Sequence, residues 1–321
     1  MIKSYLKKTA RDNLIKIAAS SMVFFMASAG LGYSLYNSLH ESFEEQVYQN
    51  LKDMAADNSE KISKDMNAKI DALNSLGTII RKYDNKDTAS LLSRMHETNA
   101  IYNFKRIGFV LPDGTAYTTD GYVKNLRFRD FFQQSMQGKI HIQHRFIDAM
   151  GVGEPVNVIS VPVSDSKGGI KGVLFATYRT SVFQRIMDIN IYGGKGSSSV
   201  INNNGDILVT STKGDLVEEN NLFEALVKVQ AGTDFIQNLL KDMSEYKIGK
   251  SKLQIDSGSY IVHYQPIALG DQKWYLLTSL PANVAYEHIK PITEKVNYFF
   301  IILYHKYNYF SSSVSPTLYL A

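Results

Sequence analysis

The feature that most constrains this chain is an uncharged run close to its N-terminus. Residues 17–36 (IAASSMVFFMASAGLGYSLY) carry no charged side chain, and a helix needs about 20 apolar residues to cross a membrane. Five basic residues between Lys3 and Lys16 precede the run, and acidic residues follow it from Glu41 onward. Because positive charge is retained on the cytoplasmic side, the pattern predicts a cytoplasmic segment over residues 1–16, a transmembrane helix over 17–36 and an extracytoplasmic remainder at the cell membrane.

Two other interpretations of this run stay open. The sequence Ala27-Ser28-Ala29 has the small-x-small form of a signal-peptidase site, so the helix could be cleaved. The run could also be a buried helix of a soluble domain. We favour the transmembrane interpretation because the apolar run continues past Ala29 and no turn follows it.

A second long-range pattern follows the uncharged run. Apolar residues recur every three or four positions, first from Leu35 to Met54 and again from Ile62 to Ile80, which predicts one long amphipathic helix. Such a helix would extend about 70 Å, more than one domain needs to cover its core, so we expect a homodimer contact through it. The alternative is a helix that lies along its own domain. Asn58 interrupts the apolar face and could mark a bend.

Composition excludes several classes of protein. With 321 residues and 44% hydrophobic content, the chain can bury the cores of about two modules. The net charge of +4 is small and the basic residues cluster at the N-terminus, which argues against nucleic-acid binding. The absence of cysteine removes disulfides, thiolate nucleophiles and cysteine-ligated zinc.

Neither a metal site nor a catalytic site is predicted. His141 and His144 lie three positions apart in an extended segment, where such side chains point to opposite faces. No G-x-S-x-G or H-E-x-x-H motif occurs in the sequence. We therefore expect a protein without catalytic residues, metal or cofactor, whose role is binding.

An internal repeat organises the globular part of the chain. A β-hairpin is predicted over Arg106–Thr118, because its Asp113-Gly114 pair supplies the positive φ that tight turns need. A second copy lies over Ser198–Thr210, with Gly205 in the turn. Two related modules are therefore expected.

Each short hairpin is followed, after an insert, by a longer hairpin whose first strand contains a proline, Pro162 in the first half and Pro266 in the second. The pattern predicts an α+β fold of two tandem modules with antiparallel sheets. The modules would occupy residues 101–190 and 191–290, and the long helix with a shorter second helix would occupy residues 37–100.

The first insert contains a candidate ligand-binding segment. Arg129 directly precedes a predicted short helix that carries Phe131 and Phe132. A guanidinium binds two carboxylate oxygens at once, and neighbouring rings exclude water. The alternative is a structural ion pair at a helix start. Since the second insert has no comparable segment, we expect the first module to bind a ligand and the second not to.

Together these features resemble the double Cache family, the extracytoplasmic sensors of bacterial chemoreceptors, histidine kinases and diguanylate cyclases. The resemblance covers about residues 17–300 and rests on the order of short motifs. They include Arg129-Asp130-Phe131-Phe132, Ile159-Ser160-Val161-Pro162-Val163, Asn204-Gly205-Asp206 and Trp274-Tyr275-Leu276-Leu277. The family implies two PAS-like modules on a long N-terminal helix between two membrane spans, with the ligand pocket in the membrane-distal module.

The resemblance also implies binding residues. Family members that bind amino acids resemble the pattern Y-x-x-x-x-R-x-W-Y, with a strand aspartate for the ammonium of the ligand. The matching positions here are Arg129 for the arginine, Phe131 and Phe132 for Trp and Tyr, Tyr122 close to the first tyrosine (a position that Lys124 occupies) and Thr177 for the aspartate. Without that aspartate an ammonium would lack its partner. A carboxylate or another small polar ligand is therefore expected rather than an amino acid.

The C-terminal segment starts a second span without completing it. Residues 296–304 (VNYFFIILY) are apolar over about half the length that a span needs, and residues 305–321 predict an irregular tail. We expect the sensory region of a membrane-bound signal transducer whose output domain is missing through truncation or a frameshift. By resemblance this output would be a diguanylate cyclase, with a histidine kinase, a chemoreceptor or a stand-alone surface-anchored solute-binding protein as alternatives.

Overall fold

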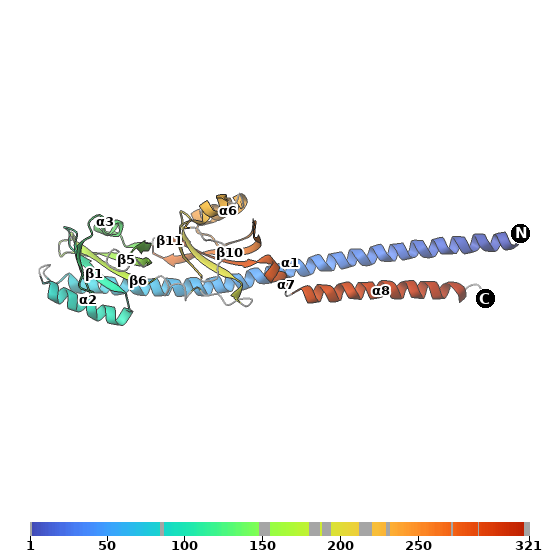
Figure 1. The fold of residues 1–321 in the computed structure, drawn as a ribbon, viewed down its shortest axis with the longest axis horizontal. Helices are drawn as coiled ribbons and strands as arrows, with labels where there is room; N and C mark the ends of the chain where they lie inside the picture. Colours follow the sequence, from blue (N-terminus) through green and yellow to red (C-terminus); the bar gives the residue numbers. More distant parts are fainter. Residues whose placement is uncertain are drawn as a thin grey trace. The chain divides into compact units, whose positions relative to one another are not determined.

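The chain begins with a single long helix, α1 (Ile2–Ile80), drawn in blue in Figure 1. It contains no proline, the residue that most readily breaks a helix. The predicted transmembrane and amphipathic segments therefore join without interruption. Helical structure also continues through Asn58, where the sequence allowed a bend.

The computed structural model describes residues 2–83, 87–147, 155–179, 187, 194–211, 220–228, 232–270, 272–287 and 289–317. The first module contains α2 (Thr88–Tyr102), β1 (Arg106–Val110), β2 (Thr115–Thr118), β3 (Val123–Asn125), α3 (Asp130–Met136), β4 (His141–Ile147), β5 (Pro155–Ser164) and β6 (Ile170–Arg179). The second contains β7 (Ser197–Asn202), β8 (Ile207–Thr210), α5 (Leu222–Lys228), α6 (Thr233–Ser244), β9 (Gly249–Ile255), β10 (Gly258–Leu269) and β11 (Gln272–Pro281). The helices α7 (Ala282–Glu287) and α8 (Lys290–Thr317) follow.

The chain divides into two compact units, residues 51–281 and residues 1–50 with 282–321. In the latter unit α8 packs on α1. The ring of Phe24 stacks on that of Tyr307 with centroids 4.0 Å apart, and the hydroxyl of Tyr286 in α7 donates a hydrogen bond to Glu44.

The helix α8 corrects the irregular tail predicted for residues 305–321, because it continues to Thr317. Residues 305–315 contain neither glycine nor proline, so the backbone there has no strong helix breaker. The irregular tail was predicted because residues 305–321 show neither apolar periodicity nor a capping signal. Their absence does not prevent a helix from forming.

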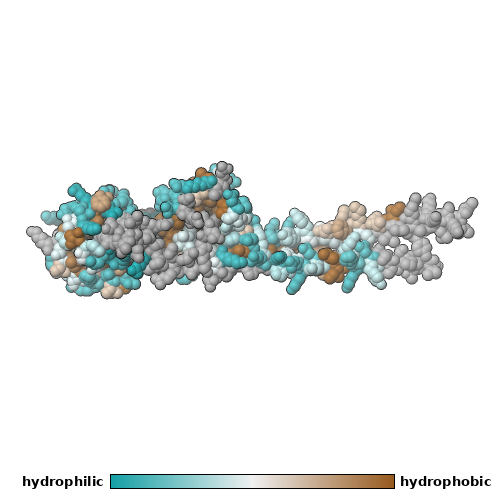
Figure 2. Space-filling model, in the orientation of Figure 1, coloured by the Kyte–Doolittle hydropathy of each residue, from teal (hydrophilic) through white to brown (hydrophobic). Residues whose placement is uncertain are grey.

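Within the described residues, α1 is the one helix long and apolar enough to cross a membrane, judged by length and composition alone. Its apolar side chains Met22, Val23 and Leu31 are exposed, and Figure 2 shows tan and brown residues at the surface of this stretch. Exposed apolar surface is costly in water, so these residues are consistent with the predicted span over residues 17–36.

The larger unit contains two antiparallel sheets (Figure 1). The first has the strand order β3-β2-β1-β6-β5-β4 and the second β8-β7-β11-β10-β9. The predicted short hairpins are β1–β2 and β7–β8, and the predicted long hairpins are β5–β6 and β10–β11. The α+β fold with two tandem modules is therefore confirmed.

The two sheets repeat position by position. The turn glycines Gly114 and Gly205 both have positive φ, 93° and 83°, which disfavours any other residue at these turns. The residues opposite each other across three strands are Val110, Val173 and Pro162 in the first sheet, and Ile201, Tyr275 and Pro266 in the second. Once these two rows are matched, each remaining row of the first sheet corresponds to one row of the second.

The sequence did not predict β9 and α6 of the second insert, whereas β4 of the first lies in the segment that was expected to be extended. The edge strands β4 and β9 extend the two sheets, and α6 covers part of the second sheet by burying Phe235, Leu239 and Met243. These three residues lie four positions apart, the spacing of one helix face. That spacing was present in the sequence and would have predicted α6.

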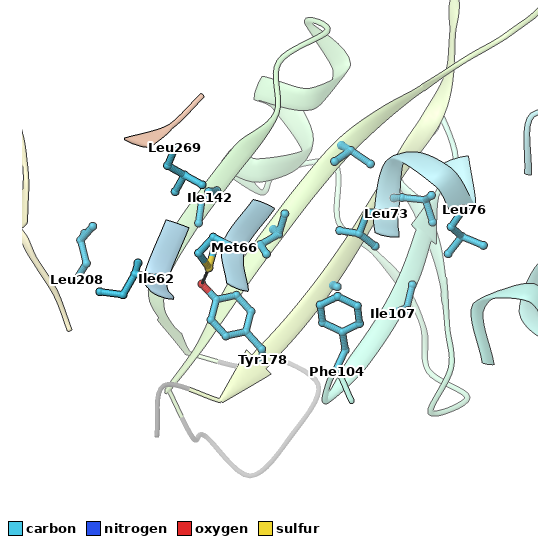
Figure 3. Close-up of a cluster of buried hydrophobic side chains, with 14 of the residues drawn as sticks. Ile62, Met66, Leu73, Leu76, Phe104, Ile107, Ile142, Tyr178, Leu208 and Leu269 are labelled. Carbon is cyan, nitrogen blue, oxygen red and sulfur yellow. Dashed lines mark hydrogen bonds between the residues drawn. The ribbon is translucent and has the colours of Figure 1, made fainter. Parts of the chain in front are cut away.

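One face of both sheets packs against α1. The helix residues Ile62, Met66 and Leu73 are fully buried in a cluster that contains side chains of both modules. Figure 3 shows the part of this cluster where the hydroxyl of Tyr178 lies 3.6 Å from Met66 Sδ. From Leu51 onward the apolar stripe is thus buried within the chain's own fold, so its periodicity is no longer an argument for a dimer contact.

Candidate functional site

The two faces of the first sheet are covered by different elements. On β6, Leu174 and Tyr178 belong to the cluster shared with α1, whereas Val173 and Phe175 belong to a separate cluster with residues of α3. Side chains alternate along a strand, so Thr177 lies on the same face as Val173 and Phe175. We call this face, remote from α1, the outer face.

The short helix α3 is held against the outer face by hydrogen bonds. The Oγ atoms of Ser135 in α3 and Ser160 in β5 lie 2.8 Å apart, and Ser160 also donates to the carbonyl of Phe131 at 3.2 Å. Both serine residues are fully buried. The start of α3, and with it Arg129, is therefore fixed relative to the sheet.

Arg129 lies at the N-cap of α3, as the sequence predicted, with an extended backbone (φ −80°, ψ 135°). Its side chain is half-buried, and its guanidinium carbon lies 4.9 Å from the centre of the Phe128 ring, within the range of a cation–π contact. The result is a cation at the margin of an apolar face, an arrangement suited to a carboxylate.

Phe131 and Phe132 belong to the core of the outer face. They are 2% and 4% exposed, and the Phe131 ring lies 5.1 Å from that of Phe175. Because both side chains are buried at the start of α3, they fix the backbone next to Arg129. Direct contact of these rings with a ligand stays a prediction.

The other two predicted residues, Tyr122 and Thr177, lie beside a second arginine that the sequence analysis missed. Arg106 is opposite Thr177 in the sheet, and its guanidinium lies 5.4 Å from the Tyr122 ring. Arg106 Nε and Nη2 lie 2.6 and 2.5 Å from Asp120 Oδ2, and the hydroxyl of Thr118 donates to Asp120 Oδ1 at 2.7 Å. The buried charge of Arg106 is thus compensated within the protein.

A sequence signal for Arg106 did exist. It begins the otherwise apolar strand RIGFV, and alternation puts Arg106 on the face of Val110. What the sequence could not supply is its partner Asp120, which a turn brings back beside it. In the same place the hydroxyl of Thr177, a 3% exposed residue, has no hydrogen-bond partner among the described residues.

The two candidate histidines contact different parts of the protein, in agreement with their predicted opposite directions. His141 Nε2 lies 3.1 Å from Asp130 Oδ2, whereas the ring of His144 packs edge-on against Trp274 with centroids 4.6 Å apart. Burial lowers the pKa of His141, and the nearby Asp130 carboxylate opposes this effect. Among the described residues, no group of three or more His, Asp or Glu side chains could hold a metal ion.

The comparisons with known proteins agree with this architecture. The family model of the Cache domain (dCache_1) matches residues 39–289. The chain belongs to the Cache family. Comparison with curated protein sequences gives no match. Cache domains of this type are extracytoplasmic sensor domains of membrane receptors, and no catalytic domain is evident in the described part of this chain.

Several solved ligand-binding domains share this Cache fold. That of the Pseudomonas aeruginosa amino acid chemoreceptor PctC, in complex with GABA, is 18% identical, with a TM-score of 0.58 over 73% of this chain and 99% of that one. The ligand-binding domain of the Pseudomonas fluorescens chemoreceptor CtaA, in complex with L-isoleucine, is 15% identical, with a TM-score of 0.61 over 80% of this chain and 99% of that one. The sensory domain of the Campylobacter jejuni chemoreceptor Tlp3, with isoleucine bound, is 10% identical, with a TM-score of 0.55 over 77% of this chain and 97% of that one. At these identities the likeness establishes the fold alone.

Proposed function

We propose that this chain is the sensory region of a membrane-bound signal transducer, and that a small carboxylate or another small polar ligand binds on the outer face of the first sheet. Arg129 would bind the carboxylate, and Tyr122, Phe131, Phe132 and Thr177 would complete the site. The observation that carries the proposal is the half-buried Arg129 at the N-cap of α3, beside the apolar outer-face cluster.

The surroundings of Thr177 favour a ligand without an ammonium group. GABA and L-isoleucine, named for the PctC and CtaA structures, carry both a carboxylate and an ammonium. In this chain Thr177 offers a neutral hydroxyl, and the neighbouring Asp120 carboxylate is already bonded to Arg106 and Thr118. Placing an ammonium there would compete with these bonds at a cost in desolvation, whereas a hydroxyl or carbonyl would pair with Thr177.

The experiment is a thermal-shift screen with acetate, lactate, pyruvate, GABA and L-isoleucine, followed by titration of the best ligand. Arg129→Ala should weaken binding by about 30- to 1000-fold, because a charge-assisted bidentate contact is lost. Arg129→Lys should restore part of the affinity, since a point charge cannot replace the fork. Both variants should melt near the parent temperature without ligand.

Arg127→Ala is the matched control, because Arg127 is an exposed arginine in the same loop. It should bind the ligand as the parent does. An equal loss in both alanine variants would point to general electrostatic attraction. An unfolded Arg129→Ala protein whose folded fraction binds normally would make Arg129 structural.

The output of the receptor is proposed only by comparison. A diguanylate cyclase was expected from the family resemblance, but the solved structures described above all come from chemoreceptors, so a chemoreceptor output fits at least as well. Fusing this chain to the cytoplasmic part of a chemoreceptor and measuring ligand-dependent swimming bias would test that output. Ligand binding without any change in swimming would argue against it.

A further inference from the structure

Both sheets add apolar side chains to the core shared with α1, but they differ in polarity at one set of equivalent strand positions on the face toward α1. In the first sheet, one row that faces α1 consists of the register partners Ile107, Ala176 and Ile159, all fully buried. The alignment of the two sheets through Pro162 and Pro266 identifies the equivalent row in the second sheet. It consists of Ser198, Thr278 and His263, which are 1%, 0% and 3% exposed.

The buried face of α1 changes in the same region. Ala55, Ile62 and Met66 are fully buried apolar residues of the shared core. Between Ala55 and Ile62, however, the buried residues are Asn58 and Ser59, which are 7% and 9% exposed. Asn58 is the residue that interrupts the apolar stripe in the sequence. The buried face of α1 is therefore polar at Asn58 and Ser59, close to the polar positions of the second sheet.

Few hydrogen bonds connect these polar groups. Gln265, two residues from His263 on β10, donates from Nε2 to Ser59 Oγ at 2.5 Å, and its Oε1 lies 3.4 Å from His263 Nε2. Within the described part of the chain, the hydroxyls of Ser198 and Thr278 have no hydrogen-bond partner. A buried hydroxyl without a partner destabilises the packing around it. We call Ser198, Thr278, His263, Gln265 and Ser59 the polar row.

We propose that the polar row is a weak point in the packing of α1, where the helix opens locally and shifts against the second sheet while the first sheet holds it firmly. An apolar row such as Ile107, Ala176 and Ile159 loses contact area with any displacement. The side-chain hydrogen bonds between α1 and the second sheet, from Gln265 to Ser59 and from Ser63 to the carbonyl of Ala268, can instead be remade with water. A structural change in the first module could then move α1 past the second. This inference holds whether or not Arg129 binds a carboxylate.

Hydrogen–deuterium exchange on the full chain in detergent tests the proposal without any ligand. Amides of α1 over residues 52–62 should exchange about tenfold faster than those over residues 66–80, because local opening sets the rate of exchange. The double variant Ser198→Ala and Thr278→Val removes both unpaired hydroxyls. It should slow exchange over residues 52–62 by about tenfold and leave residues 66–80 unchanged.

Thr177→Val is the matched control, because it removes an equally buried hydroxyl without a partner from the face of the first sheet remote from α1. It should leave exchange over residues 52–62 unchanged. Thr278→Val alone, which keeps the side-chain shape, replaces the double variant if that protein melts below the parent. Equal exchange of the two α1 segments in the parent, or no slowing in a normally melting Thr278→Val protein, overturns the proposal.

Spin labels measure the shift itself. Since the chain has no cysteine, Lys61→Cys on α1 and Lys252→Cys on β9 can be labelled specifically, and both positions are exposed. The distribution of distances between the labels should be broad in the parent background and narrower with Thr278→Val. Equally narrow distributions in the two backgrounds would show that α1 does not shift.

Discussion

At the scale of single residues, the first module depends on a buried charge that is compensated within the protein. Arg106 is 2% exposed and its guanidinium bonds to Asp120, which also accepts from Thr118. Thr118 in turn accepts a hydrogen bond from the backbone N–H of Tyr122 at 3.0 Å. The ion pair therefore ties the segment of Tyr122 to the sheet beside Thr177.

Replacing Asp120 with Asn should leave the Arg106 charge without its carboxylate. We expect the free energy of unfolding to fall by about 3 kcal/mol, because removing one partner of a buried ion pair leaves an uncompensated charge. Urea denaturation would measure the loss. Asp53→Asn, an exposed carboxylate on α1, should change the same quantity by less than about 0.5 kcal/mol. A loss no larger than in this control would mean that other groups compensate Arg106.

Histidines whose pKa values are lowered by burial should make the free energy of unfolding depend on pH. Burial lowers the pKa of His263, and the nearby Lys52 acts in the same direction while the bond to Gln265 opposes it. Burial lowers the pKa of His144 to about 3. In the unfolded chain both imidazoles take up protons below their ordinary pKa of about 6.5, whereas in the folded protein they take up protons only at lower pH. The free energy of unfolding should therefore fall as the pH drops below about 6.5.

Melting temperatures measured between about pH 7.5 and 5 would check this dependence. His263→Gln removes one titrating group and should flatten the decrease, with the remaining slope due to His144 and to His141, whose pKa burial also lowers. The exposed His96 provides the control, and His96→Gln should be as steep as the parent. If His263→Gln is equally steep, the neutral state of His263 makes no contribution to folding.

At the scale of secondary-structure elements, the packing inside the first sheet requires a glycine in β1. A Cβ on Gly108 would lie 2.4 Å from Phe175 Cε1 and 3.1 Å from Thr118 Cγ2. Because the Phe175 ring lies directly over this backbone and contacts Phe131, a side chain at Gly108 would displace both rings of the outer face.

Gly108→Ala should lower the free energy of unfolding by about 1–3 kcal/mol, the usual cost of overpacking, and should also weaken ligand binding. Gly77→Ala in α1 is the opposite case. Its Cβ would lie 3.4 Å from Val163 and 3.5 Å from Leu174, and alanine favours a helix over glycine by about 1 kcal/mol. Thermal denaturation should show a lower melting temperature for Gly108→Ala and a higher one for Gly77→Ala. A Gly108→Ala protein as stable as the parent would mean that the Phe175 ring can move at little cost.

At the scale of the whole molecule, any self-association must use a surface other than the buried stripe. Val47 and Leu51 are fully buried within the chain, whereas Leu35 is 42% exposed and Leu39 and Phe43 are partly exposed. We propose that the chain forms a homodimer through this earlier part of α1, since that is where the apolar stripe remains accessible.

The full chain in detergent should therefore sediment as a dimer, and the fragment of residues 51–281, which is one compact unit, should sediment as a monomer. The fragment lacks the exposed positions of the stripe and keeps those buried in its own core. Dimers of both proteins would assign the contact to the modules instead. A full chain that sediments as a monomer would contradict the proposed homodimer.

The sequence by itself determined the features that depend on neighbouring residues. The period of the apolar residues predicted α1, the Asp113-Gly114 and Gly205 turns predicted the short hairpins, and Arg129 was correctly located at the start of α3. Turn geometry, helix period and capping are properties of a few consecutive residues, so they can be deduced without the fold. The binding role of Arg129 is still a prediction, because a ligand contact is not a local property.

Only the tertiary structure decided what each side chain contacts. Sheet register paired Arg106 with Thr177 and placed Thr278 between Ser198 and His263, although these residues are far apart in the sequence. The same folding buried the stripe of α1 from Ala55 onward in the chain's own core. An apolar stripe records that a helix face avoids water and does not record which surface covers it, because the hydrophobic effect has no direction.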